Sequence, residues 1–279
     1  MRSRRISTIF MVRRCRRKRC PGLPIRSPAE MEEWSHRPLD PVYVAIFIDA
    51  IVVKVREGQV ANRPVYAAIG VTLEGRKDVL GLTMGTGGGE GAKFWMSVLV
   101  GLKNRGVRDV FFLVCDGLKG LPEVVENVWP HTIVQTCIIH LMRNSFRLVP
   151  RQQWDALRKD LKLIYTAPTP DAAAIALEEL DEKWGRRYGA LIRLWRNAWE
   201  QFIPFLDYDV DIRKLICSTN AIESLNARYR RAVRARGHFP TEQAALKSER
   251  SACSCAQTCG WASRHSTVLP NSAVVVMDR

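Results

Sequence analysis

The spacing of apolar and polar positions predicts strands in the first third of the chain. Residues 42–56, VYVAIFIDAIVVKVR, form an apolar, β-branched run that is typical of a buried strand turning into a second one. Residues 63–84 hold two further strand-like runs around a polar turn at 74–78. We therefore expect the ordered part of the chain to begin with a meander of three strands.

Beyond this meander the pattern changes to helices and strands in alternation. The predicted elements are, in order, a helix ending at Gly106, a strand at 109–117, a helix at about 119–128, a strand at 132–137 and a helix from about 138. The loop GTGGGEG before the first helix lacks the glycine–lysine spacing of a phosphate-binding loop, so we interpret it as a flexible connection. The order β-β-β-α-β-α-β-α predicts an α/β fold with a mixed sheet covered by helices on both faces.

Residues 150–216 differ from the rest because only helical periodicity occurs there. We expect an all-helical insertion at 150–216 within an α/β domain formed by residues 41–149 and 217–247. Residues 1–40 and 248–279 show no convincing pattern, which predicts a basic leader and an atypical tail.

The chain carries a formal charge of +15, and residues 1–20 alone hold nine arginines and lysines and no acid. This balance favours a polyanionic partner, of which nucleic acid is the commonest. A basic arm that binds RNA or a membrane surface is the weaker alternative. No apolar run is long enough for a transmembrane helix, and the eight cysteines form no disulfide framework. We therefore expect an intracellular, cytoplasmic protein without a membrane partner.

Three acidic residues occupy unusual positions. Asp49 interrupts the apolar run at 42–56, Asp116 follows FFLVC at the carboxyl end of a strand, and Glu223 stands in a basic helix. Each also has an ordinary explanation, which is a turn for either aspartate and a capping box with Asn220 for the glutamate. An acid in a buried strand is costly unless it is paired or binds a metal. If the fold brings the three together, they form a carboxylate cluster for divalent ions such as Mg²⁺.

The helix around Glu223 also predicts a surface for phosphates. Its apolar side chains fall on one stripe, Ile222, Leu225, Tyr229 and Val233, and a basic stripe runs beside it. Arginines on such a stripe neutralise a DNA backbone that the acids alone would repel. The arginines that we expect to contact DNA are Arg143, Arg228, Arg230, Arg231, Arg234 and Arg236, with a solvated side chain as the alternative for the first.

Between about Met31 and Lys247 the chain resembles the bacterial Mutator-type transposases, the IS256 family. The resemblance rests on FIDAIVVKVR, AIGVTLEGRKDVLGL, EGAKFW, LKNRGV, CDGLKGLPE, VQTCIIHLMRNS, YTAPT and STNAIESLN followed by RGHFPTEQAALK. It implies an RNase H-like fold with a DDE catalytic triad of Asp49, Asp116 and Glu223. The helical insertion would then lie between the second and third members of the triad.

The same resemblance implies a reaction and its partners. Members of the family cut DNA at the ends of their element and join it to target DNA, using two Mg²⁺ ions that Mn²⁺ can replace. The partners expected for this chain are double-stranded DNA, as terminal inverted repeats and target, and further copies of the chain in a homo-oligomer. A DNA-binding remnant without activity is the alternative function.

Several residues are secondary candidates for the lining of the site. By the resemblance, the family's Cys-x-x-His corresponds to Cys137 and His140. Zinc binding is a weak alternative for this pair, because it supplies only half of a tetrahedral site. Trp195 or Trp199 could stack on a base near the cut, although both are first expected in the core, and His238 would contact DNA or close its helix. The tail cysteines that could complete a zinc site are Cys253, Cys255 and Cys259.

Both ends of the chain depart from the family pattern. Members of the family are longer at the N-terminus, and they continue with further helices after the segment that matches up to Lys247. We expect a copy with an intact catalytic core and with truncated or frame-shifted ends.

Overall fold

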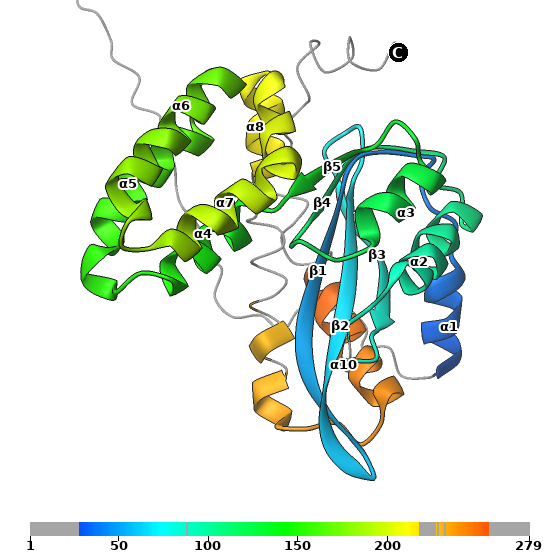
Figure 1. The fold of residues 1–279 in the computed structure, drawn as a ribbon. Coiled ribbons are helices and arrows are strands. Elements are labelled where there is room, and N and C mark those ends of the chain that lie inside the picture. Colours follow the sequence, from blue (N-terminus) through cyan, green and yellow to red (C-terminus); the bar gives the residue numbers. More distant parts are fainter. Residues whose placement is uncertain (1–27, 88, 218–226, 228, 232, 257–279) are drawn as a thin grey trace, which may run out of the picture.

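A computed structural model gives the fold and describes residues 28–87, 89–217, 227, 229–231 and 233–256. Figure 1 shows a body built on a twisted sheet and, to one side of it, a bundle of helices. None of the described helices is long and apolar enough to cross a bilayer.

Five strands form one mixed sheet. The strands are β1 (Val42–Glu57), β2 (Gln59–Val71), β3 (Lys77–Met84), β4 (Asp109–Cys115) and β5 (Ile133–Thr136), in the spatial order β3-β2-β1-β4-β5. The first three pair antiparallel as a meander, whereas β4 pairs parallel with β1 and β5 pairs parallel with β4. The element order therefore agrees with the mixed α/β fold that the sequence predicts.

The course of β1 corrects one prediction. The run at 42–56 does not turn into a second strand but continues as a single strand of 16 residues, which ends in a hairpin at Gly58. Glycine suits that position because its φ is +76°. β-branched residues follow Asp49, and the antiparallel ladder with β2 continues to the end of the strand. Asp49 therefore lies in mid-strand, opposite Ala67, and not in a turn.

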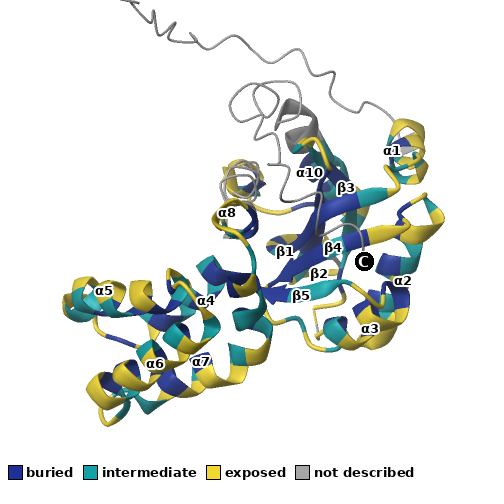
Figure 2. Cartoon of the chain, turned by 90° about the horizontal axis from the view of Figure 1, so that it is seen from above, coloured by how far each residue is buried: buried dark blue, intermediate teal, exposed yellow. Residues whose placement is uncertain are grey.

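Alternate residues of β1 face two separate hydrophobic cores. The helices that cover the sheet are α2 (Ala92–Asn104), α3 (Leu121–Val128), α4 (Ile138–Arg147) and α10 (Glu242–Ala256). Ile46 and Ile48 lie in the core that α2 and α3 complete, whereas Phe47 and Ile51 lie in the core that includes residues of α4 and α10. Figure 2 shows the central strands as largely buried between these layers. Since the faces alternate along a strand, each side chain of β1 is assigned to one layer by its position.

The chain between α4 and the last part of the sheet body forms a helical bundle. Its helices are α5 (Trp154–Tyr165), α6 (Pro170–Leu180), α7 (Gly189–Phe202) and α8 (Val210–Cys217), with short turns η1 (Arg151–Gln153), η2 (Asp181–Gly185) and η3 (Ile203–Asp207). Every regular element described from residue 151 to residue 217 is helical, as the sequence predicts.

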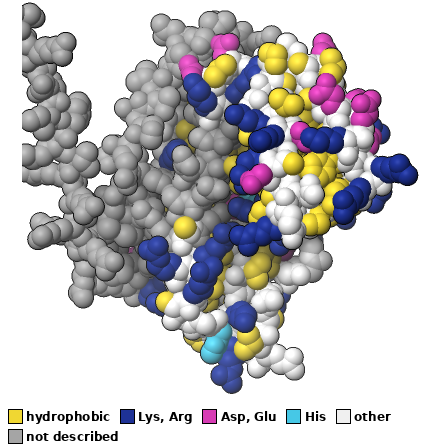
Figure 3. Space-filling view, turned by 90° about the vertical axis from the view of Figure 1, so that its left-hand side faces the viewer, with side chains coloured by type: hydrophobic (Ala, Val, Ile, Leu, Met, Phe, Trp, Pro, Cys, Tyr) yellow, Lys and Arg dark blue, Asp and Glu magenta, His cyan; other side chains and the backbone are white. Residues whose placement is uncertain are grey.

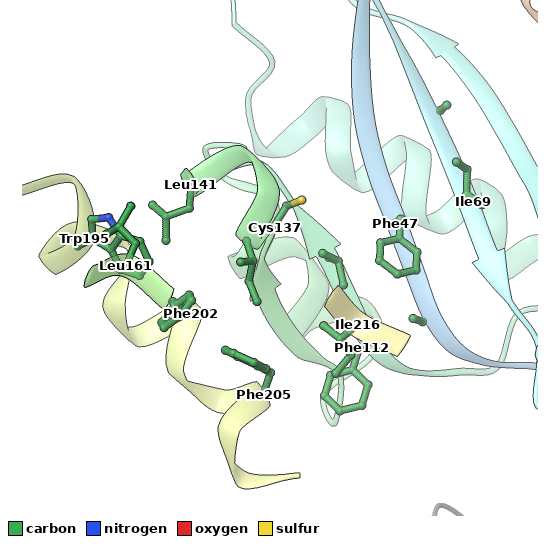
Figure 4. Close-up of a cluster of buried hydrophobic side chains, with 14 of the residues drawn as sticks. Phe47, Ile69, Phe112, Cys137, Leu141, Leu161, Trp195, Phe202, Phe205 and Ile216 are labelled. Carbon is green, nitrogen blue, oxygen red and sulfur yellow. The ribbon is translucent and has the colours of Figure 1, made fainter. Parts of the chain in front are cut away.

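The bundle is joined to the sheet through a continuous core. Figure 4 shows Trp195, Phe202 and Phe205 of the bundle in one line of buried side chains that reaches Phe112 on the sheet. The amide of Gln135 on β5, itself fully buried, donates from Nε2 to the carbonyl of Phe202 at 2.8 Å. This contact satisfies a buried amide donor while fixing α7 to the edge of the sheet.

Regular structure continues at both ends of the described chain into segments for which the sequence predicts none. Part of the expected leader is the helix α1 (Pro28–His36), and the expected tail continues α10 beyond Lys247 to Ala256. Trp34 joins the two helices, because the guanidinium carbons of Arg37 and Arg250 lie 4.8 and 4.2 Å from the centre of its ring.

The continuation of α10 was hidden in the sequence by polar residues in core positions. Ala245, Ser248 and Glu249 are spaced as one buried helical stripe, and all three are buried. Two of them are polar, so the segment lacks the apolar periodicity that would have predicted a helix.

Candidate catalytic site

Two aspartates meet at the end of β4. β1 and β4 run parallel, and Ile48 pairs with Cys115 in the last step of their ladder. The next residues on the two strands are Asp49 and Asp116. Since side chains alternate along a strand, both carboxylates lie on the face opposite Ile48. Asp49 is only 7% exposed, whereas the side chain of Asp116 is 40% exposed at the strand end.

His140 lies between the two carboxylates. Its helix, α4, follows Cys137, whose backbone N–H donates to the carbonyl of Cys115 at 2.8 Å and sets the start of α4 beside the end of β4. The ring of His140 has Nε2 3.7 Å from Oδ1 of Asp49 and Nδ1 3.9 Å from Oδ2 of Asp116. Both distances exceed hydrogen-bond length, and Nδ1 has no hydrogen-bond partner in the described part of the chain.

The charges around Asp116 act in opposite directions. Burial raises the pKa of this carboxyl above its ordinary value, and the charge of Asp49 raises it further. The positive charges of His140, Arg143 and Arg147 lower the pKa. The two arginines follow His140 on α4 after about one and two turns, so one side of this helix carries the cations that compensate the acids.

The two aspartates fit a divalent cation that takes few protein ligands. Among the described residues there is no group of three His, Cys, Asp or Glu side chains placed to hold a metal ion. Mg²⁺ commonly takes one or two carboxylates and completes its shell with water and phosphate oxygens. Asp49 and Asp116 supply such a pair of hard oxygen donors. The third predicted ligand, Glu223, lies outside the described residues.

Burial keeps the two thiols near the site in their neutral form. Cys115 and Cys137 are buried, and burial raises the thiol pKa to about 12 for the first and about 11 for the second. Zinc binds the thiolate form, so a zinc ion here would have to displace the proton of a buried thiol. Cys253 and Cys255 belong to α10, and Cys259 lies outside the described residues.

In its described residues, the predicted basic helix has a buried apolar side and an exposed basic side, as the sequence predicts. Residues 229–231 and 233–236 are helical, and Tyr229 is fully buried. Four of the predicted DNA-contacting arginines in this segment are exposed: Arg230, Arg231, Arg234 and Arg236. Arg143 on α4 is also exposed, whereas Arg228 lies outside the described residues.

The structure places Trp195 in the core, as first expected, and contradicts its alternative role as a base-stacking residue. Its side chain is fully buried in the bundle, and its Nε1–H donates to Oγ of Ser145 at 2.9 Å. A base cannot reach a ring that is enclosed on all sides. Trp199 is half-buried and packs against Phe202, with 5.8 Å between the ring centres.

His238 lies far along the sheet from the carboxylate pair. It is exposed beside Phe239, which makes an isolated bridge with Val55 near the far end of β1. Six residues of strand separate Val55 from Asp49, which corresponds to about 20 Å. His238 therefore does not line the site that the two aspartates form.

One basic residue near the site was missed by the sequence analysis. Arg147 follows His140 and Arg143 on the same side of α4, and its charge acts on Asp116. The spacing of seven residues from His140 was the available signal, because such positions lie two turns apart on one helix face.

Comparison with known proteins identifies the family. Residues 26–252 match the family described as Transposase, Mutator family. The chain belongs to the Mutator family of transposases. The matched residues begin before Met31 and continue beyond Lys247, so they include all of α1, which was expected in the leader, and part of the extension of α10 that was expected in the tail.

Three relatives show how much of the Mutator-family protein this chain represents. A probable transposase for an insertion sequence element of Corynebacterium diphtheriae is 47% identical over 221 residues, 78% of this chain and 64% of the relative. The transposase for insertion sequence element ISRM3 of Rhizobium meliloti is 47% identical over 217 residues, 77% of this chain and 54% of the relative. The transposase for insertion sequence element IS256 in transposon Tn4001 of Staphylococcus aureus is 25% identical over 223 residues, which are 77% of this chain and 55% of the relative. The chain therefore spans about half to two thirds of the length of these relatives.

Proposed function

We propose that this chain is the catalytic core of a DDE transposase with an RNase H-like fold. The observation that carries the proposal is the pair of Asp49 and Asp116 on adjacent parallel strands, with His140 between them. The element order supports it, since an antiparallel meander is followed by parallel strands and their helices. Membership of the Mutator family supports it independently. The bundle inserted after α4 separates the aspartate pair from the segment that contains Glu223.

In this proposal Asp49, Asp116 and Glu223 hold the metal ions. When bound, two Mg²⁺ ions activate the attacking oxygen and stabilise the leaving oxygen of a phosphodiester. The position of Asp49 is fixed by its pairing with Ala67 of β2 and by the ladder with β4, which ends at the preceding residue. Asp116 lies at the exposed strand end, where a phosphate can approach. The charge of His140 lowers the pKa of Asp116 and so favours its ionised form, which is the form that binds a metal.

The proposed reaction has two steps. In the first, a water oxygen attacks a phosphorus at the element end, the bond from that phosphorus to the 3′ oxygen breaks, and a free 3′-hydroxyl is left on the element. In the second, this hydroxyl attacks a phosphorus of the target strand and displaces the 3′ oxygen of that strand. One phosphorus–oxygen bond forms and one breaks in each step, so no covalent bond to the protein is needed.

The partners follow from the same chemistry. The exposed arginines named above, with Arg143 on α4, neutralise phosphates of double-stranded DNA, both at the terminal inverted repeats and in the target. Two element ends are joined to one target, so we include a homo-oligomer in the proposal.

Nicking of the DNA that flanks the gene tests this function. Purified protein is incubated with a plasmid carrying the flanking genomic DNA and Mg²⁺ or Mn²⁺, and nicks are mapped at nucleotide resolution. We expect metal-dependent nicks at element ends. Asp116→Ala should abolish them while DNA binding remains, because the residue holds metal and does not grip the backbone. Asp155→Ala is the matched control, since that side chain is 91% exposed on α5.

The outcomes separate the two functions under comparison. Nicks in the wild type and in Asp155→Ala, but not in Asp116→Ala, support the DDE transposase. DNA binding without nicks in any of the three proteins would instead identify a DNA-binding remnant.

A further inference from the structure

An apolar groove lies on α4 next to the carboxylate pair. It has a volume of about 400 Å³ and is lined by Ile139, Met142, Arg143, Phe146, Arg147 and Trp154. The rings of Phe146 and Trp154 are tilted against each other with 5.4 Å between their centres. The indole N–H of Trp154 donates to the carbonyls of Phe146 and Val149, both at 3.0 Å, so the orientation of this ring is fixed.

Four arginines border the groove, and one of them, Arg158, is paired with the carboxylate of Asp155 at 3.3 Å. Arg143 and Arg147 are exposed at its rim, and Arg151 and Arg158 place their guanidinium carbons 5.9 and 5.8 Å from the centres of the Trp154 and Phe146 rings. None of the described residues that line the groove is acidic. Figure 3 shows a face of the molecule on which Lys and Arg side chains border apolar ones. An aromatic surface with arginines at its edge suits a planar ligand that carries negative charge.

The position of the groove relates it to the proposed cut. His140 and the groove residue Phe146 are six residues apart on α4, which is about 9 Å along the helix axis. Arg143 and Arg147 relate the two places, because they line the groove and follow His140 by one and two turns on α4, while the ring of His140 lies between the two aspartates. A ligand in the groove would therefore lie beside a phosphodiester held at the two aspartates.

We propose that this groove binds an unpaired base of the DNA strand next to the scissile phosphate. The base stacks on Phe146 and Trp154, and Arg143 and Arg147 hold the phosphates on either side of it. A cation over an exposed ring contributes less than a stacked base, so the base can displace the guanidinium groups that lie over the rings. This inference rests on the proposed function, since it requires a DNA strand at the site.

Two probes of equal charge distinguish base stacking from phosphate binding. Both are fluorescein-labelled strands of twelve nucleotides with the same number of phosphates, and they differ only in that the first carries thymine on every sugar whereas the second carries no bases. We expect the wild-type chain to bind the thymidine strand about tenfold to a hundredfold more tightly in fluorescence anisotropy. Phe146→Ala should remove this preference, whereas Phe146→Tyr should keep it because the ring remains. Arg147→Ala should weaken the binding of both probes by the same factor.

The preference is the ratio of the affinities that one variant shows for the two strands. A partial loss of folded protein lowers both apparent affinities and leaves this ratio unchanged. Phe94→Ala is the matched control, because Phe94 is a half-buried ring on α2 that does not line the groove, and we expect this variant to keep the preference. A wild type that binds both strands equally, or a preference that survives in Phe146→Ala, would overturn the inference while leaving the proposed function in place. A wild type that binds neither of these strands nor duplex DNA would overturn both.

Discussion

The side chain of Glu249 places an acid in the hydrophobic interior. It is fully buried on α10, and neither carboxylate oxygen has a hydrogen-bond partner in the described part of the chain. Burial raises its pKa from 4.5 to about 7. The folded state therefore binds more protons than the unfolded state between these values. It follows that the free energy of unfolding falls as the pH rises through this range, by roughly 3 kcal/mol in total.

Replacing Glu249 with leucine should remove the free-energy cost of burying a charged carboxylate. We expect Glu249→Leu to raise the free energy of unfolding by roughly 2–3 kcal/mol at pH 8 and by clearly less at pH 5, where the acid is already neutral in the folded chain. Urea denaturation at both pH values measures the difference. Glu179→Leu, an exposed acid on α6, should change stability by less than about 0.5 kcal/mol at either pH. An equal gain at pH 5 and pH 8 would show that the buried charge is not its source.

At the residue scale, the sequence revealed the acids but not their surroundings. Asp49 and Asp116 were found because one interrupts an apolar run and the other ends one, which are local signals. The burial of Glu249 has no local signal, because it arises from the packing of α10 against β3 and β1. The same limit left two roles open for Trp195, since a tryptophan on a helix has one sequence pattern whether its ring is enclosed or exposed.

At the scale of elements, hydrophobic periodicity was sufficient to predict the order of the strands and helices, but it did not predict where each of them ends. The continuity of β1 depends on pairing with β2, which holds the strand extended as far as the turn at Gly58. Nothing within the segment itself distinguishes one long strand from two. The N-terminus of α3 differs from β1, because there a single glycine determines how closely two helices approach each other.

The starts of α2 and α3 lie in close contact at Gly120. This residue precedes α3 with a φ of +74°, and a Cβ added to it would lie 3.0 Å from the backbone nitrogen of Ala92. Both the backbone conformation and the close approach therefore require glycine. Gly101, within α2, differs in both respects, because a Cβ there would meet no atom within 4 Å and helices favour alanine over glycine.

Alanine at these two positions should have opposite effects. We expect Gly120→Ala to lower the free energy of unfolding by about 1–3 kcal/mol. The matched variant Gly101→Ala should raise it by up to about 1 kcal/mol. Chemical denaturation of the two variants beside the wild type is the measurement. If both variants lose stability to the same extent, the contact between the two helix starts is not what requires glycine.

At the scale of the whole molecule, the candidate site lies where the sheet meets the bundle. α4 belongs to both parts, since its first turn carries His140 toward the aspartates and its last turns carry Phe146 toward α5. The two aspartates stood out in the sequence because one interrupts an apolar run and the other ends one. The aromatic groove could not, because it exists only once α4 and α5 are packed together.

The positive charge of the molecule has two sources that can be separated. One is the segment of residues 1–20, with nine arginines and lysines, and the other is the set of exposed arginines on the folded part. Each phosphate that a cation neutralises on duplex DNA contributes about 0.9 to the slope of log binding constant against log salt concentration. The slope therefore counts contacts, whichever segment makes them.

We expect the folded arginines to dominate this slope. Replacing Arg230, Arg231 and Arg234 together with alanine should reduce its magnitude by about 3. Deleting residues 1–20 should weaken binding only modestly, because in the proposed function the duplex is held at the catalytic site. Fluorescence anisotropy of a labelled duplex over a series of salt concentrations measures both. If the deletion abolishes binding while the triple variant keeps the wild-type slope, the basic leader and not the folded core holds the DNA.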